Sequence, residues 1–254
     1  MTSVTRQQLT LLLNQQLQPE LVQDFCPNGL QVEGKKDIEV LVTGVTASQA
    51  LVDAAIAVSA DAILVHHGYF WKNEPAIITG MKKTRLQRLL THNINLFAYH
   101  LPLDIHPELG NNAQLGRLLG ITAWQPLRAV QPQGVVMIGQ FSEPKPLETV
   151  SRLLQHALGR DVLSHAAGDR LISQVAWCTG GGQGYIDAAA EAGAQLFITG
   201  EVSEQTIHSS RELGIHFIAA GHHATERYGV KALGEWLATE TGIQVEFIDI
   251  PNPA

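Results

Sequence analysis

The sequence predicts an α/β protein built from two similar lobes, each with a mixed sheet flanked by helices. Strand-like runs such as IEVLVTGV, DAILVHH and NINLFAYH alternate with helical stretches such as SQALVDAAIAVS and MKKTRLQRLLTH. This βαβ rhythm is typical of a largely parallel sheet. The rhythm returns after residue 174, where VAWCTGGGQGYIDAAAEAGAQLFITGE aligns with VTGVTASQALVDAAIAVSADAILVHHG and Asp187 falls over Asp53.

The remaining segments complete these two lobes, which we expect to span residues 1–125 and 126–254. An amphipathic helix opens the chain, with Leu9, Leu12, Leu13 and Leu17 on its apolar face. GVVMIGQFSEPKPLETVSRLLQHALGR predicts a strand and a helix, and the last residues predict a helix that stops at Gly242 before a strand VEFIDI.

Composition excludes several classes of protein. The formal net charge is −7 and no basic run occurs, so we do not expect a nucleic acid partner. Cys26 and Cys178 lie far apart and form neither a disulfide framework nor a CxxC motif. The absence of a signal peptide pattern and of a long apolar run predicts a cytoplasmic protein without a membrane partner.

Histidine is concentrated where predicted strands end. Five of the eleven histidines lie in the clusters HHG, HLPLD and GHHATE. In open α/β sheets ligands bind outside the carboxyl ends of strands, and two facing lobes would bring these ends into one cleft. Imidazole suits Zn, Fe, Ni and Co, whereas carboxylate oxygens suit harder ions such as Mn. A mixed set of His and Asp or Glu therefore indicates a borderline divalent metal.

Each cluster alone also has an ordinary explanation. His66 and His67 are adjacent at a strand end and should point to opposite sides, so both can be ligands only if they serve different metals or the strand has already turned. The ordinary explanation is that one is a buried, hydrogen-bonded residue and the other is exposed. Pro102 should end regular structure and hold His100 and Asp104 on a loop, and Asp104 can simply complete a turn.

In GHHATE, His222 and Glu226 are four residues apart at a predicted helix start and can reach a common ion. Glu226 can equally complement the helix dipole.

Other polar features leave their role open. The CTGGGQG loop can be a structural turn or can bind the substrate, and it lacks the spacing of a dinucleotide or P-loop motif. Glu201, His208 and His223 can line the cleft or lie in the core. DFCPNGLQVEG has a Pro-Asn-Gly turn signature, and no GxSxG or local Cys signature supports a covalent nucleophile.

Taken together, the motifs PNGLQVEG, VHHGYFWK, HLPLDIHPELGNNAQL, WCTGGG, ITGEVSEQTIH and GHHATERYG resemble those of the GTP cyclohydrolase 1 type 2 homologues, also called NGG-interacting-factor-like proteins. The resemblance covers nearly the whole chain. It implies two α/β lobes, a homohexameric toroid and two divalent metal ions per subunit. It also implies the metal ligands His66, His67, Asp104, His222 and Glu226, with Glu226 as the bridge, and it leaves open whether His100 is a further ligand or supports the ligands.

These features lead to a main hypothesis and two alternatives. The first is a metal-dependent hydrolase with two ions (Zn, Mn, Fe, Ni or Co), in which Glu226 is a catalytic ligand and His100 or His223 carries a proton. Its substrate would be a small molecule, and the family name suggests a nucleotide or a purine. The alternatives are a non-enzymatic metal-binding or scaffold toroid, and a DNA-binding protein.

Overall fold

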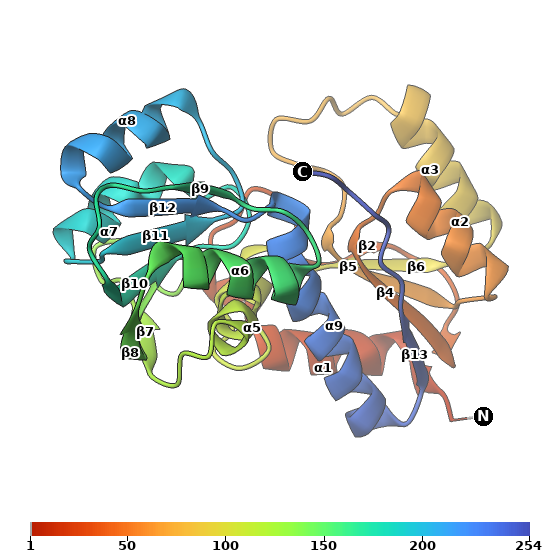
Figure 1. Cartoon of the computed structure of the whole chain (residues 1–254). Helices are drawn as coiled ribbons and strands as arrows, with labels where there is room; N and C mark the ends of the chain where they lie inside the picture. The colour runs from red at the N-terminus through yellow and green to blue at the C-terminus, as the bar shows by residue number, and fades with distance from the viewer. Residues whose placement is uncertain (1) are drawn as a thin grey trace. The chain divides into compact units, whose positions relative to one another are not determined.

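The computed structural model describes residues 2–254 and has the α/β architecture with mixed sheets that the sequence predicts (Figure 1). It contains two compact units. Unit 1 comprises the chain up to Leu103 together with Gly229–Pro251, and unit 2 comprises Asp104–Tyr228 together with Asn252–Ala254. These bounds differ from the expected 1–125 and 126–254, because α5 (Asn111–Leu118) packs in the core of unit 2 and β13 (Gln244–Phe247) pairs with β4 in unit 1.

Unit 1 contains a five-stranded sheet in the order β13-β4-β5-β6-β2. The strands β13, β4, β5 and β6 are parallel, and β2 is antiparallel to β6. Their bounds are β2 Gly29–Val32, β4 Val40–Thr46, β5 Ala62–His67 and β6 Asn95–Ala98. A separate pair joins β1 (Val4–Thr5) to β3 (Asp37–Ile38).

Helices flank this sheet because their apolar positions recur at helical spacing. In α1 (Arg6–Leu17) the buried residues are Leu9, Leu13 and Leu17, and Thr5 begins the helix with a capping box. Helices α2 (Gln49–Ala57) and α3 (Gly80–Thr91) bury apolar side chains in one core with residues of β4, β5 and β6. Helix α9 (His222–Thr241) begins in unit 2, and its later turns belong to unit 1.

Unit 2 repeats the parallel βαβαβ arrangement in β10, β11 and β12, and antiparallel strands flank these three on both sides. Its six-stranded sheet has the order β7-β8-β10-β11-β12-β9, in which β10, β11 and β12 are parallel and the other three strands are antiparallel to their neighbours. The bounds are β7 Trp124–Pro126, β8 Met137–Lys145, β9 Leu163–His165, β10 Ile172–Trp177, β11 Leu196–Thr199 and β12 His216–Ala219.

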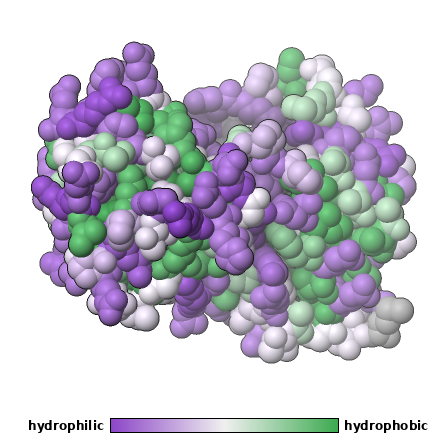
Figure 2. Space-filling model, viewed as in Figure 1, coloured by the Kyte–Doolittle hydropathy of each residue, from purple (hydrophilic) through white to green (hydrophobic). Residues whose placement is uncertain are grey.

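The helices of unit 2 divide between the two faces of this sheet. Helices α5 and α6 (Leu147–Leu158) join the core that contains Trp177, Leu196 and Ile218. Helices α7 (Ile186–Glu191) and α8 (Glu204–Leu213) contact β11 and β12. Only Thr206 and Ser210 of α8 are buried, and the face of α8 seen in Figure 2 is mainly hydrophilic.

Three short helical elements complete the described chain. They are the 3-10 turns Pro19–Leu21 and Gln183–Tyr185, and α4 (Leu101–Asp104). Within residues 2–254, no helix is both long and apolar enough to cross a membrane.

Asp61 ties together the start of the unit 1 sheet. Its carboxylate accepts hydrogen bonds from the backbone N–H groups of Glu39 and Val40 and from Lys35 Nζ, at 2.9, 3.0 and 2.5 Å. Burial by itself would raise the pKa of Asp61, but these hydrogen bonds outweigh it and the pKa is lowered. The ionised carboxylate therefore stabilises the junction between β4 and β5.

We expect Asp61→Asn to lower the free energy of unfolding by about 1–3 kcal/mol at pH 7, because an amide cannot accept from all three donors. Because the folded pKa is depressed, this contribution is present above the unfolded value of about 3.9 and is lost as pH falls through the folded pKa. Urea unfolding at pH 7 and pH 3 measures the difference.

The matched control is Asp53→Asn, whose carboxylate is half exposed beside Arg88 and should change stability little. Equal effects of the two substitutions at pH 7 would show that the Asp61 network has no special role.

Candidate metal centre

Three imidazole rings converge in unit 1 at the carboxyl ends of β5 and β6. His66 is fully buried and His67 is half-buried at the end of β5, while His100 follows β6. The ring centres lie 4.5 Å apart for His66 and His67, 5.0 Å for His66 and His100, and 5.8 Å for His67 and His100. The rings of His66 and His67 therefore lie close together, although the two residues are adjacent at the end of β5.

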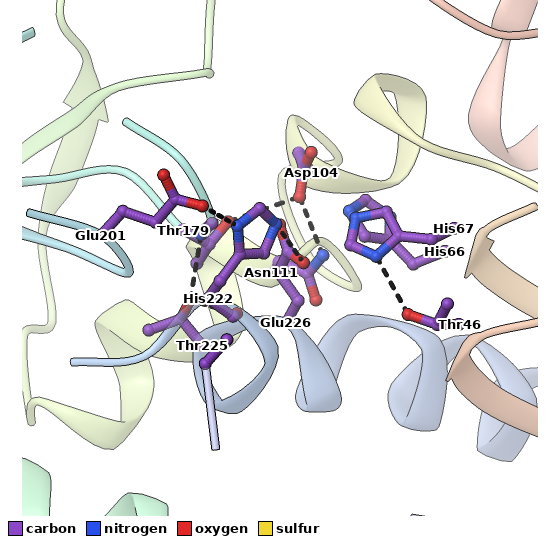
Figure 3. Close-up of polar contacts among 12 residues, drawn as sticks. Thr46, His66, His67, Asp104, Asn111, Thr179, Glu201, His222, Thr225 and Glu226 are labelled. Atoms are coloured by element: carbon purple, nitrogen blue, oxygen red, sulfur yellow. Dashed lines mark hydrogen bonds and ion pairs between the residues drawn. The ribbon is translucent and has the colours of Figure 1, made fainter. Parts of the chain in front are cut away.

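Each of these rings is held through its Nδ1 atom. His66 Nδ1 donates to the carbonyl oxygen of Tyr99 at 3.0 Å, since a carbonyl can only accept. His67 Nδ1 lies 3.2 Å from Thr46 Oγ1, and His100 Nδ1 lies 2.7 Å from Asp24 Oδ1. In Figure 3 the dashed line joins Thr46 to the ring of His67. Nε2 of each ring is therefore the nitrogen that can bind a cation.

Asp24 is a functional candidate that the sequence analysis missed. Besides His100, its carboxylate accepts from Asn28 Nδ2 and from the N–H groups of Phe25 and Leu101, at 2.9, 2.6 and 2.9 Å. Burial opposes ionisation, but the hydrogen bond from His100 and the others outweigh it and lower the pKa of Asp24. Its segment, DFCPNGLQVEG, was interpreted only as a turn.

Asp104 lies in unit 2 on the short helix α4, which corrects the expected loop. Pro102 fits this helical turn because its missing N–H falls among first-turn groups that have no partner within the helix. The Asp104 side chain is buried, and its Oδ1 accepts from Asn111 Nδ2 at 2.8 Å and from Thr179 Oγ1 at 3.4 Å (Figure 3). These two donors, which the sequence analysis did not name, fix the carboxylate.

His222 and Glu226 share one face of α9, as their spacing predicts. His222 Nε2 lies 3.2 Å from Glu226 Oε2, and His222 Nδ1 lies 2.8 Å from Glu201 Oε1 (Figure 3). The hydrogen bond to Glu226 is the main cause that raises the pKa of His222 to about 9, and Glu201 adds to it against the effect of burial. A carboxylate oxygen of Glu226 also lies within 4.8 Å of one of Asp104.

Glycines of the CTGGGQG loop give the Glu226 carboxylate its space. Gly180 has a φ of +65°, and a Cβ there would lie 2.1 Å from Glu226 Oε1 and 3.1 Å from His222 Nε2. The loop is held by hydrogen bonds from Gly180 N to Thr225 Oγ1 and from Gly200 N to Gly180 O. This loop therefore borders the candidate ligands.

The remaining predicted residues lie in different surroundings. Glu201 contacts His222 directly and also accepts from Gln183 at 3.1 Å. His223 is buried, and its backbone N–H donates to Ala254 O. His208 is exposed on α8, with its ring nitrogen 4.0 Å from Glu204. Of the two cysteines, Cys178 is the buried first residue of the CTGGGQG loop, and burial raises its pKa well above the usual value.

The donor sets of both units fit divalent cations. Unit 1 offers three imidazoles, whose ligand nitrogens lie within 4.8 Å of one another. Unit 2 offers two buried carboxylates and one imidazole with carboxylates at both of its nitrogens. Such carboxylate neighbours orient a histidine and make it a better metal ligand. The residues that could hold metal in unit 1 are His66, His67 and His100, and those in unit 2 are Asp104, His222 and Glu226.

Fold and donors together define an α/β protein with candidate cation-binding residues in both units. The chain belongs to the Duf34/NIF3 (NGG1p interacting factor 3) family, whose model matches residues 4–253.

Two relatives match this chain over nearly its whole length. The chain is 60% identical over 250 residues to the GTP cyclohydrolase 1 type 2 homolog of Yersinia pestis, covering 97% of this chain and 98% of the relative. It is 54% identical over 248 residues to the homolog of Escherichia coli K12, with the same coverage.

Solved structures support the fold. The chain is similar to a protein ybgI of unknown function, with a TM-score of 0.95, 54% identity, and coverage of 99% of this chain and 100% of that one. It is also similar to TTHA1606 from Thermus thermophilus, with a TM-score of 0.89, 36% identity and the same coverage.

We expect Gly180→Ala to lower the affinity of the chain for a divalent cation by at least about 10-fold, because the added Cβ displaces the Glu226 carboxylate. Equilibrium dialysis with Zn²⁺ measures this loss. Gly184→Ala is the matched control, since a Cβ at Gly184 meets no atom within 4 Å. Wild-type affinity in a folded Gly180→Ala chain would contradict the placement of the cation next to Glu226.

Proposed function

We propose that this protein is a metal-dependent hydrolase that binds two divalent cations through His66, His67, Asp104, His222 and Glu226. The observation that carries the proposal is the buried Glu226 carboxylate, 3.2 Å from His222 Nε2 and within 4.8 Å of an Asp104 oxygen. A carboxylate that lies near two other candidate metal ligands, here His222 and Asp104, is suited to bridge two ions. Glu226 is therefore the proposed bridge.

The proposed ions are borderline divalent cations. Zn, Mn, Fe, Ni and Co all remain candidates, because His and carboxylate donors accept each of them.

When bound, two divalent cations lower the pKa of water toward neutrality and polarise an oxygen of the substrate. The chain's own residues would orient the reactants and move a proton. The side chain of Asp104 is held in place by Asn111 and Thr179, and that of Glu226 by His222. The proton carrier is either His100, which is paired with Asp24, or the buried His223.

The substrate class rests on the relatives. The homologs of Yersinia pestis and Escherichia coli carry the name GTP cyclohydrolase 1 type 2 homolog, which supports a nucleotide or purine-like substrate. We further propose a cytoplasmic homohexamer, as the family resemblance implies. Light scattering should then give a particle mass about six times the chain mass of 27.6 kDa.

We expect Glu226→Gln to lower turnover by about 100-fold or more, because it removes a charge that orders the reacting groups. The measurement loads the purified protein with Mn, Zn, Fe, Ni or Co in turn and screens GTP, other nucleotides, phosphoesters and peptides. Glu235→Gln on the same helix is the matched control, since Glu235 is exposed and only approaches Lys231.

A negative result has a defined meaning. If no metal form turns over any substrate above the Glu226→Gln level, while metal removal sharply lowers the melting temperature, the hydrolase proposal is wrong. The protein is then a non-enzymatic metal-binding or scaffold protein.

A further inference from the structure

A cavity of about 540 Å³ lies in unit 2, between α6 and the chain that connects β9 to β10. Helix α6 forms one side of it with Leu147, Ser151 and Gln155, which recur at helical spacing. Ala166 and residues 168–171 line the other side. A cavity of this volume can hold a small organic molecule.

This cavity lies at the opposite end of the unit 2 sheet from the candidate metal ligands. Its lining includes His216, which begins β12, and Leu171, which directly precedes β10. Thr179 and His222, in contrast, follow the carboxyl ends of the same two strands. At about 3.3 Å per residue, the length of β12 places roughly 13 Å between its two ends. A molecule in this cavity would therefore occupy a second site.

Ser151 is the residue whose surroundings indicate a ligand. It is only 8% exposed, and its Oγ has no hydrogen-bond partner within the described residues. Burying a hydroxyl without a partner costs free energy. Ser151 lies one helical turn from Leu147 and one from Gln155, which both line the cavity, so its hydroxyl is on the same face of α6. A polar group bound in the cavity would supply the missing partner.

The first turn of α6 borders the same cavity. Pro146 is the N-cap residue and provides no side-chain acceptor, so the backbone N–H groups of Leu147 and Glu148 have no partner within the helix. Helical side chains tilt toward the N-terminus, which brings the Ser151 hydroxyl over this turn. Free N–H groups and the positive end of the helix dipole attract anions. This end of the cavity therefore favours a negatively charged group.

The charged residues of the lining suit a ligand with one anionic group. Glu148 pairs with Arg152 one turn further along α6, and these side chains are 74% and 73% exposed. Neither Arg170 nor Asp169 forms an ion pair within the described residues. The guanidinium of Arg170 is thus available to an anion, whereas the neighbouring carboxylate opposes a highly charged ligand such as a triphosphate.

His216 holds the wall of the cavity that carries Arg170. The buried His216 ring accepts a hydrogen bond at Nδ1 from the N–H of Ala167, at 3.1 Å, and donates from Nε2 to the carbonyl oxygen of Arg170, at 2.9 Å. Both ring nitrogens are therefore engaged, and His216 supports the wall instead of binding the ligand. The wall is in place before a ligand arrives, which lowers the cost of binding.

We propose that this cavity is a second binding site, which takes a small organic phosphate monoester. The phosphate accepts hydrogen bonds from the N–H groups of Leu147 and Glu148, from Ser151 Oγ and from the guanidinium of Arg170. The organic part packs on the apolar side chains of Leu147 and Leu171. The site shares no residue with the proposed metal centre and does not depend on it.

The test is isothermal titration calorimetry of the full chain with ribose 5-phosphate, and with ribose as the uncharged comparison. Ribose 5-phosphate should bind equally well before and after EDTA removes any bound metal, and ribose should not bind. Ser151→Ala and Arg170→Gln should each weaken binding by at least about 10-fold, because each removes a donor to the phosphate. Ser142→Ala and Arg128→Gln, which are exposed in unit 2 and outside this cavity, are the matched controls.

Thermal unfolding without ligand separates binding from a structural role. Ser151→Ala should melt at or above the wild-type temperature, because the hydroxyl that it removes has no partner within the described residues. Wild-type affinity in a folded Ser151→Ala chain, or ribose that binds as tightly as ribose 5-phosphate, would overturn the proposal. So would binding that disappears with EDTA, which assigns the phosphate to the metal centre, or no binding up to about 10 mM.

Discussion

Burying polar side chains without a hydrogen-bond partner is costly, and this constraint governs the whole candidate site. His66, Asp104 and Glu226 are all buried where strands give way to helices or turns. His66 is held by a backbone carbonyl, Asp104 by an amide and a hydroxyl, and Glu226 by an imidazole. These partners fix the side chains in place before any ligand binds. That preorganisation lowers the cost of binding a cation.

The partners come from segments whose sequence indicates only turns and helix starts. Asn111 opens α5, Thr179 follows β10, and Asp24 precedes the Pro-Asn-Gly turn. Thr179 and Asp24 bond partners 75 and 76 positions away, and Asn111 bonds Asp104 from the next helix, seven positions away, so no local pattern marks these side chains. No local pattern marks Gly180 either, because the need for glycine there comes from the Glu226 carboxylate, 46 positions further along the chain.

Much of the fold could be predicted from the sequence, because strands and helices leave periodic apolar patterns. β4, β5 and β6 and their repeat in β10, β11 and β12 follow the expected runs, and α9 begins at His222. The bounds of the units could not be predicted, because they depend on where α5 and β13 pack. The helical turn at Pro102 also differs from expectation, since local backbone geometry at strand ends has no sequence period.

The central claim is that this chain holds two divalent cations next to Glu226. Anomalous X-ray diffraction from crystals of the Zn²⁺-loaded protein tests it most directly. The account predicts two anomalous peaks per chain, about 3.5–4 Å apart, with an oxygen of Glu226 bound to each ion. A single peak at full occupancy, or two peaks whose ligands do not include Glu226, would contradict it.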